Sequence, residues 1–157
     1  MFFFSALHCP VGATLFDRQQ KESCWLKGTV RFSNLLHLED AVEMKGWYQP
    51  TSWNQGGYDA VFIDIEEGTR KRHVRFVHVA NGLTHDLRLD YMYLLLKCFA
   101  EHFETNEVEI VFVVSPKRLE EFKIVKVIGS GLLNEFGWHT NKEIDQCKIL
   151  ALKHWTF

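Results

Sequence analysis

The chain has 157 residues, of which 46 % are hydrophobic and 14 % aromatic, and its formal net charge is -2. This size and apolar content suit one folded domain with a single core. The charge balance excludes a chain-wide basic field, so binding to a phosphate backbone would need a local patch of cations. No stretch approaches the run of about 20 apolar residues that a membrane-spanning helix needs. We therefore expect no membrane partner.

The cysteines show no metal-binding spacing. Cys9, Cys24, Cys98 and Cys147 are far apart, and neither a CxxC pair nor a histidine at zinc-finger spacing accompanies them. We expect reduced thiols in an intracellular protein, either nuclear or cytoplasmic.

The N-terminal third has the weakest pattern. Residues 1–30 are apolar at first and then polar, and they predict a poorly defined segment ahead of one domain over residues 31–157. Ser33 can cap a helix whose apolar side chains, including Leu35, Leu38 and Val42, recur three and four residues apart until Gly46. The loop over residues 47–57 follows, and it contains a short apolar stretch near Trp47.

The middle of the chain predicts a β-hairpin. Tyr58–Ile65 is an apolar strand, and His73–Ala80 is a second one. The charged segment 66–72 between them contains Gly68, which suits the tip of a hairpin. We expect the two strands to pair antiparallel.

A helix and a buried strand should follow. Thr84 can cap a long helix that carries apolar residues from Leu87 to Phe99. Val108–Val114 is a nearly unbroken β-branched run, typical of a strand that is buried on both faces and reached by a helical crossover. The remainder predicts a helical turn, two strands and a glycine loop, namely Lys117–Phe122, Ile124–Ile128, Cys147–Lys153 and residues 129–131.

A candidate site lies on the hairpin. Asp59 stands at the head of the first strand, where a carboxylate in a packed sheet needs a cation, a partner or a wet cleft. In metal-dependent nucleases, an acid on one strand and an acid with a basic residue on the next converge on Mg²⁺. Here the second strand offers His78 and Ala80. Asp59 is therefore either a metal ligand or a strand-end residue, and His78 and His85 are either acid–base groups or structural histidines.

The candidate contacts to nucleic acid are five cations. They fall after the first hairpin strand and after the other buried strand: Lys71, Arg72, Arg75, Lys117 and Arg118. Such residues form either a phosphate-binding patch for DNA or RNA or a solvated face of the protein.

Several segments together resemble the C-terminal region of the retrotransposon hot spot proteins of trypanosomatids, which are similar to Crinkler effectors. In chain order, the segments that carry the resemblance are Trp47-Tyr48-Gln49-Pro50, Trp53-Asn54-Gln55, Tyr58-Asp59-Ala60-Val61-Phe62, Val74-Arg75-Phe76-Val77-His78-Val79, Thr84-His85, Val108-Glu109-Ile110-Val111-Phe112-Val113-Val114, Gly129-Ser130-Gly131-Leu132 and Gly137-Trp138. They cover residues 45–155.

The resemblance implies an α/β fold with the mixed sheet of restriction-endonuclease-like nucleases, whose core runs α-β-β-β-α-β. The first of these strands would lie near Trp47, and the core is incomplete at its N-terminal side if that strand is missing. Asp59 matches the metal-binding acid of the family and His85 matches its following histidine. His78-Val79-Ala80 stands where the family has Gln-x-Thr, so both functional side chains differ.

The function that follows is a PD-(D/E)xK-like domain with impaired catalysis, which acts in the nucleus by contacting nucleic acid or proteins of chromatin and transcription. One alternative is an active Mg²⁺-dependent nuclease that uses Asp59 and His78. Another is a degenerate copy from a multigene family, without a function of its own.

Overall fold

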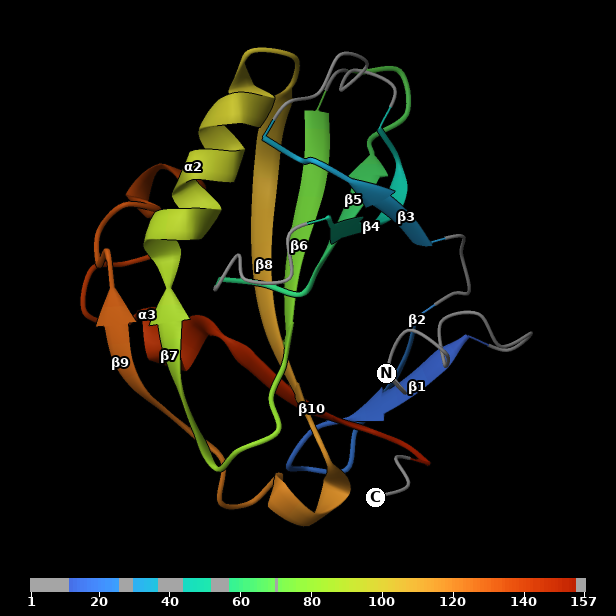
Figure 1. Cartoon of the computed structure of the whole chain (residues 1–157), viewed down its shortest axis with the longest axis vertical. Helices are drawn as coiled ribbons and strands as arrows, with labels where there is room; N and C mark the ends of the chain where they lie inside the picture. The colour runs from blue at the N-terminus through green and yellow to red at the C-terminus, as the bar shows by residue number, and fades with distance from the viewer. Residues whose placement is uncertain (1–11, 26–29, 37–43, 52–56, 70, 155–157) are drawn as a thin grey trace.

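The computed structural model describes residues 12–25, 30–36, 44–51, 57–69 and 71–154. Within these ranges the protein is an α/β fold with a large mixed sheet, one long helix against it and a small separate pair of strands (Figure 1). The helices and strands are β1 (Ala13–Phe16), β2 (Glu22–Trp25), β3 (Val30–Ser33), β4 (Gly46–Pro50), β5 (Ala60–Ile65), β6 (Lys71–Val79), β7 (Thr84–Arg88), α2 (Leu89–Ala100), β8 (Glu104–Val114), β9 (Lys123–Ile128), α3 (Glu143–Gln146) and β10 (Lys148–Leu152), with 3₁₀ turns at Pro116–Arg118 and Asn134–Phe136.

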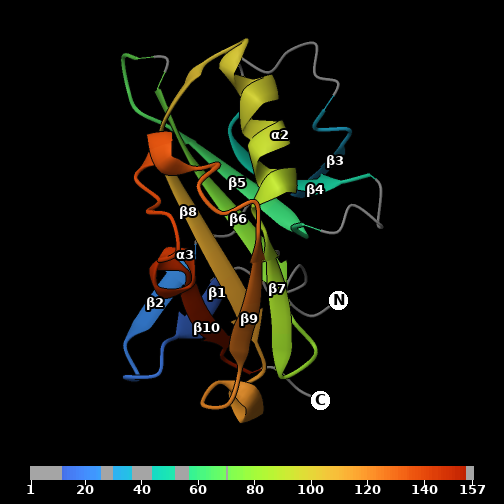
Figure 2. The same cartoon turned by 90° about the vertical axis from the view of Figure 1, so that its left-hand side faces the viewer.

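The large sheet has eight strands in the order β2-β1-β10-β8-β6-β5-β4-β3. β5 runs antiparallel to both β4 and β6, whereas β8 runs parallel to its neighbours β6 and β10. β7 and β9 form a separate parallel pair, which lies beside the large sheet at the start of α2 (Figure 2). The predicted antiparallel hairpin and the parallel buried strand after a helical crossover are thus confirmed. β4 lies near Trp47, where the resemblance would place the first strand of the core.

β8 shows why a continuous apolar run forms a central strand. Val108, Ile110 and Phe112 project into one hydrophobic core, whereas Val111 and Val113 project into a second core on the other face. Since successive side chains of a strand point to opposite faces, burial on both sides requires an apolar residue at nearly every position.

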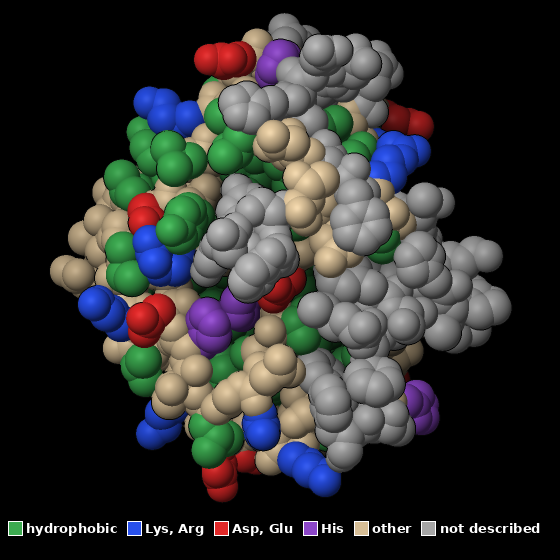
Figure 3. Space-filling model, viewed as in Figure 1, with side chains coloured by type: hydrophobic (Ala, Val, Ile, Leu, Met, Phe, Trp, Pro, Cys, Tyr) green, Lys and Arg blue, Asp and Glu red, His purple; other side chains and the backbone are tan. Residues whose placement is uncertain are grey.

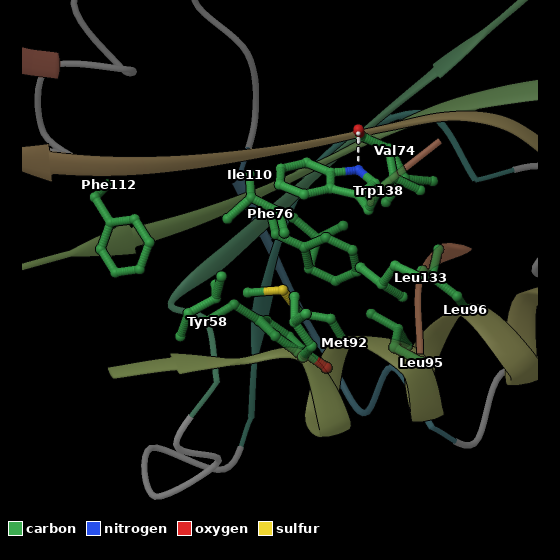
Figure 4. Packing of buried hydrophobic residues seen from close by; sticks show 14 of the residues in the cluster. Tyr58, Val74, Phe76, Met92, Leu95, Leu96, Ile110, Phe112, Leu133 and Trp138 are labelled. Atoms are coloured by element: carbon green, nitrogen blue, oxygen red, sulfur yellow. Dashed lines mark hydrogen bonds between the residues drawn. The ribbon is translucent and has the colours of Figure 1, made fainter. Parts of the chain in front are cut away.

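The first core fills the space between the sheet and α2 (Figure 4). Phe76 of β6 and Phe112 of β8 project into this core from the sheet, and Met92 and Leu95 project into it from α2. All four side chains are buried. Trp138 closes this core from the C-terminal region, and its Nε1–H donates a hydrogen bond of 3.0 Å to the carbonyl oxygen of Val108. That bond satisfies the polar atom of a buried indole.

The second core shows that the large sheet curls. Trp25 lies on the edge strand β2, and Trp47 lies on β4, which is next to the opposite edge. Their ring centroids are nevertheless only 5.5 Å apart. The two ends of the sheet therefore approach each other over this core, which also contains Val77 and Val113.

Two predicted elements need correction. The helix expected from Thr84 begins only at Leu89, because Thr84–Arg88 is the strand β7 and pairs with β9. Pairing with a distant strand overrides the local capping signal. The helix expected between Ser33 and Gly46 falls largely on residues 37–43, which lie outside the described residues. The loop expected over residues 47–57 is wrong at its start, because Gly46–Pro50 is the strand β4.

The N-terminal segment, for which no element was predicted, contributes the two strands β1 and β2. β1 pairs antiparallel with β2 and with β10, where Leu15 lies opposite Leu152. The side chain of Arg18, in the turn between β1 and β2, donates hydrogen bonds of 2.9 and 2.6 Å to the carbonyl oxygens of Leu119 and Phe122. Residues 13–25 are thus joined to the rest of the sheet. In the part of the chain that the structure describes, no helix is long and apolar enough to cross a membrane.

Candidate functional site

Asp59 and His78 meet where β5 begins and β6 ends. The backbone N–H of Asp59 donates to the carbonyl oxygen of Val77 at 2.8 Å, which sets the residue beside the end of β6. Its carboxylate Oδ2 accepts the backbone N–H of Val79 at 2.7 Å and lies 3.4 Å from Nδ1 of His78. The prediction that the two side chains lie together on adjacent antiparallel strands is confirmed.

His85 completes a cluster of three titratable side chains. Its ring lies against that of His78 in a tilted arrangement, with centroids 3.9 Å apart and planes inclined by 54°. Both rings also contact Phe112, which holds them against the first core. Nδ1 of His85 lies 2.8 Å from the carbonyl oxygen of Asp86, so in the neutral ring Nδ1 carries the proton and Nε2 is an acceptor. The space-filling view shows histidine side chains side by side on this face, next to acidic ones (Figure 3).

The surroundings of His78 keep its imidazole neutral. Burial lowers the pKa of His78 to about 4, although the charge of Asp59 acts to raise it, and the neighbouring His85 lowers it further. The ring is 14 % exposed, and its buried Nδ1 makes no hydrogen bond to the described residues, because 3.4 Å from Asp59 is long for one. A buried polar atom without a hydrogen bond costs free energy, and such atoms are frequent at functional sites.

The cluster does not fit Mg²⁺. This ion prefers several oxygen ligands in octahedral geometry. Asp59 supplies one carboxylate, of which one oxygen already accepts the Val79 amide, and Ala80 supplies no side-chain ligand. Among the described residues, no group of three or more histidine, cysteine, aspartate or glutamate side chains could hold a metal ion.

A transition metal shared by the two imidazoles is also disfavoured by the ring geometry. Two histidines on one tetrahedral ion would hold their ring centroids about 5 Å apart, given metal–nitrogen bonds of about 2.0 Å. The observed separation is 3.9 Å. The cluster is instead suited to accept hydrogen bonds and to exchange protons.

The predicted phosphate-binding cations do not form one patch. Lys71 is exposed at the start of β6, opposite Glu104 at the start of β8. Lys117 and Arg118 follow the other end of β8, which is 11 residues long, so they lie roughly 30 Å from Lys71.

The other two predicted cations face protein groups. Arg72 is buried, only 3 % exposed, and its guanidinium lies 5.0 Å from the ring centroid of Phe103. Arg75 points to the opposite face of β6 from His78, and its Nε donates to Glu109 at 3.0 Å.

A second charged cluster, which the sequence analysis missed, surrounds Glu109. Its carboxylate contacts Nε2 of His73 at 3.3 Å, Nε of Arg75 at 3.0 Å and Nζ of Lys148 at 2.9 Å. Burial acts to raise the pKa of Glu109, but these three partners outweigh it and lower the pKa to about 2. The sequence contains a pattern that indicates this cluster. Acidic residues alternate with apolar ones at the start of β8, and the basic residues His73 and Arg75 alternate with apolar ones on the neighbouring strand β6.

Comparisons with known proteins add no relative, because no family model, curated protein or solved structure matches this chain.

Proposed function

We propose that this chain is a binding domain of the retrotransposon hot spot type, with a restriction-endonuclease-like core that contacts nucleic acid in the nucleus but does not cleave it. Two features support the core. Apart from β7, which belongs to the separate pair, the chain order β4, β5, β6, α2, β8 follows the β-β-β-α-β part of that fold. β5 is antiparallel to β4 and β6, and β6 is parallel to β8. Asp59 and His78 occupy the adjoining strand ends where such a core would carry its metal-binding acids.

The observation that carries the loss of cleavage is the neutral imidazole of His78 beside Asp59. A second carboxylate at this position would give Mg²⁺ another oxygen ligand, whereas imidazole is a poor ligand for that ion. Ala80 also lacks the amino group that would assist the attacking water in the acid-x-Lys pattern. One carboxylate alone binds Mg²⁺ weakly, so a metal-activated water would not be held in place.

A cleavage assay tests the proposal. Single- and double-stranded DNA and RNA would be incubated with the chain and Mg²⁺ or Mn²⁺, in parallel with Asp59→Asn and with Asp64→Asn as the matched control on β5. Asp64 is exposed, and its carboxylate accepts a hydrogen bond from the neighbouring backbone amide of Ile65. We expect the same background rate for all three proteins.

One observation favours the alternative of an active Mg²⁺-dependent nuclease. The Asp59 side chain is 32 % exposed, and its Oδ1 makes no hydrogen bond to the described residues, so this oxygen is available to a cation. Metal-stimulated cleavage that is lost in Asp59→Asn but retained in Asp64→Asn would establish this alternative and reject ours.

Binding without cleavage has its own measurement. Lys117 and Arg118 lie together in one turn and are the best placed of the predicted cations. With two or three phosphates neutralised, the log-log salt slope for duplex DNA should be about -2 to -3. Fluorescence anisotropy with Lys117→Gln/Arg118→Gln should show a shallower slope, whereas Lys71→Gln at the far end should bind like the unchanged chain. Binding that is insensitive to salt and to both variants would point to a protein partner.

A further inference from the structure

A second candidate site lies on the opposite face of the sheet from His78. A cleft of about 550 Å³ runs between the β1–β2 turn and strands β6, β8 and β10. Its volume is in the range of pockets that hold small organic ligands. Arg75 lines it, and since Arg75 and His78 are three positions apart on β6, their side chains project to opposite faces. The site is therefore independent of the proposed function.

The lining of the cleft carries an excess of positive charge in a chain whose net charge is -2. Each of its two carboxylates faces protein donors. Asp17 accepts the backbone amides of Gln19 and Lys21, both at 2.9 Å, and Glu109 pairs with Arg75 and Lys148. Among the described residues, no acidic group pairs with the ammonium of Lys21. Within the described part of the chain, the side chain of Arg18 donates to two carbonyl oxygens and pairs with no carboxylate.

Arg75 is held in position with its outer nitrogens available. Its guanidinium carbon lies 4.7 Å from the ring centroid of Trp25 and 5.5 Å from that of Phe62, which fixes the plane of the group. Only Nε donates to Glu109, so Nη1 and Nη2 make no hydrogen bond to the described residues. A fixed guanidinium fork suits the oxygen atoms of phosphate or carboxylate.

We infer that this cleft binds a small organic phosphate, with the phosphate group held by Arg75 and Lys21. A phosphate monoester carries a charge of about -1.5 to -2 at neutral pH. This charge matches the excess of positive over negative side chains in the lining, Arg18, Lys21, Arg75 and Lys148 against Asp17 and Glu109, better than a single carboxylate does. Trp25 and Leu150 supply an apolar wall for the organic part of the ligand. A free nucleotide and the 5′-phosphate end of a nucleic acid share this chemistry.

Calorimetric titration of the whole chain at low ionic strength tests the inference, with AMP, inorganic phosphate and succinate as probes. We expect saturable binding of AMP, weaker binding of phosphate and no binding of succinate. Lys21→Gln and Arg75→Lys should each weaken AMP binding by roughly tenfold, since the first removes a charge-assisted contact and the second replaces a fixed guanidinium fork with a flexible ammonium. A 5′-phosphorylated dinucleotide that binds more tightly than AMP would identify the end of a nucleic acid as the source of the phosphate.

Lys126→Gln is the matched control, because Lys126 is exposed on β9 and does not line the cleft. The side chain of Lys21 is exposed, and its ammonium makes no hydrogen bond or ion pair with the described residues, so its variant should melt like the unchanged chain even if Arg75→Lys perturbs the pairing with Glu109. Absence of AMP binding in the millimolar range would overturn the inference. An equal loss of affinity in Lys126→Gln, or succinate binding as tight as that of AMP, would do the same.

Discussion

Burial keeps the imidazole of His78 neutral, and the stability of the native protein therefore depends on pH. The pKa of His78 is about 4 in the native protein, whereas an unfolded histidine titrates near 6.5. Between these values the unfolded chain binds a proton that the native protein excludes, so acidification favours unfolding. Glu109 acts in a lower window: its native pKa of about 2 adds stability that is lost as the pH falls from about 4.5 toward 2.

We therefore predict that the free energy of unfolding decreases as the pH falls from 6.5 to about 4, with a contribution from His78 on the order of 3 kcal/mol. Urea denaturation at several pH values measures it. His78→Gln should flatten this limb of the stability curve, whatever its effect at neutral pH. His139→Gln is the control, since His139 is exposed. If His78→Gln keeps the full slope between pH 6.5 and 4, the ring is not held neutral by burial.

At the scale of the elements, the sequence predicts the strands whose own residues specify them. β5, β6 and β8 are rich in β-branched and aromatic residues, and the charged segment between β5 and β6 contains a glycine suited to a turn. β7 could not be found in this way, because its sequence Thr-His-Asp-Leu-Arg has little apolar alternation and begins with a good helix cap. It becomes a strand by pairing with β9, which lies more than thirty residues further along the chain.

The two side-chain clusters also differ in how well the sequence predicts them. Asp59 and His78 could be predicted together, because a hairpin fixes which residues are opposite each other. The cluster around Glu109 requires the register of three strands, β6, β8 and β10, and of these only β6 and β8 follow each other through a predictable crossover. The contribution of Lys148 depends on a strand at the far end of the chain.

The contact between the segment before β5 and helix α2 gives a prediction at this scale. A methyl group added at Gly57 would lie 2.7 Å from Cβ of Tyr91, which is closer than two carbon atoms can approach. Gly57→Ala should therefore destabilise the fold by about 1–3 kcal/mol, as overpacking does in other cores. Gly82→Ala is the matched control, because its methyl group would meet no atom closer than 3.6 Å. Equal urea midpoints for the two variants would show that α2 yields to the added methyl group.

At the scale of the whole molecule, the curled sheet brings its two ends together over the second core. β1 pairs with β10 at one side of the sheet, and β2 lies on the outer side of β1 (Figure 1). Trp25 of β2 then reaches across the second core to Trp47 near the other side. Arg75 stacks on Trp25 as well, so a single indole links the N-terminal strands, the middle of the sheet and the Glu109 cluster. Segments that are far apart in the sequence are joined in one core, which favours a single cooperative unit.

We predict that Trp25→Ala lowers the stability of the entire chain by about 3–5 kcal/mol, because it removes a large buried side chain from that core. Thermal unfolding followed by near-ultraviolet circular dichroism and by far-ultraviolet circular dichroism should shift together to a lower temperature and remain one transition. Ser23→Ala, on the same strand and exposed, should leave the midpoint unchanged. Two separate transitions in Trp25→Ala would mean that β1 and β2 unfold on their own, and that the sheet on the α2 side is stable without them.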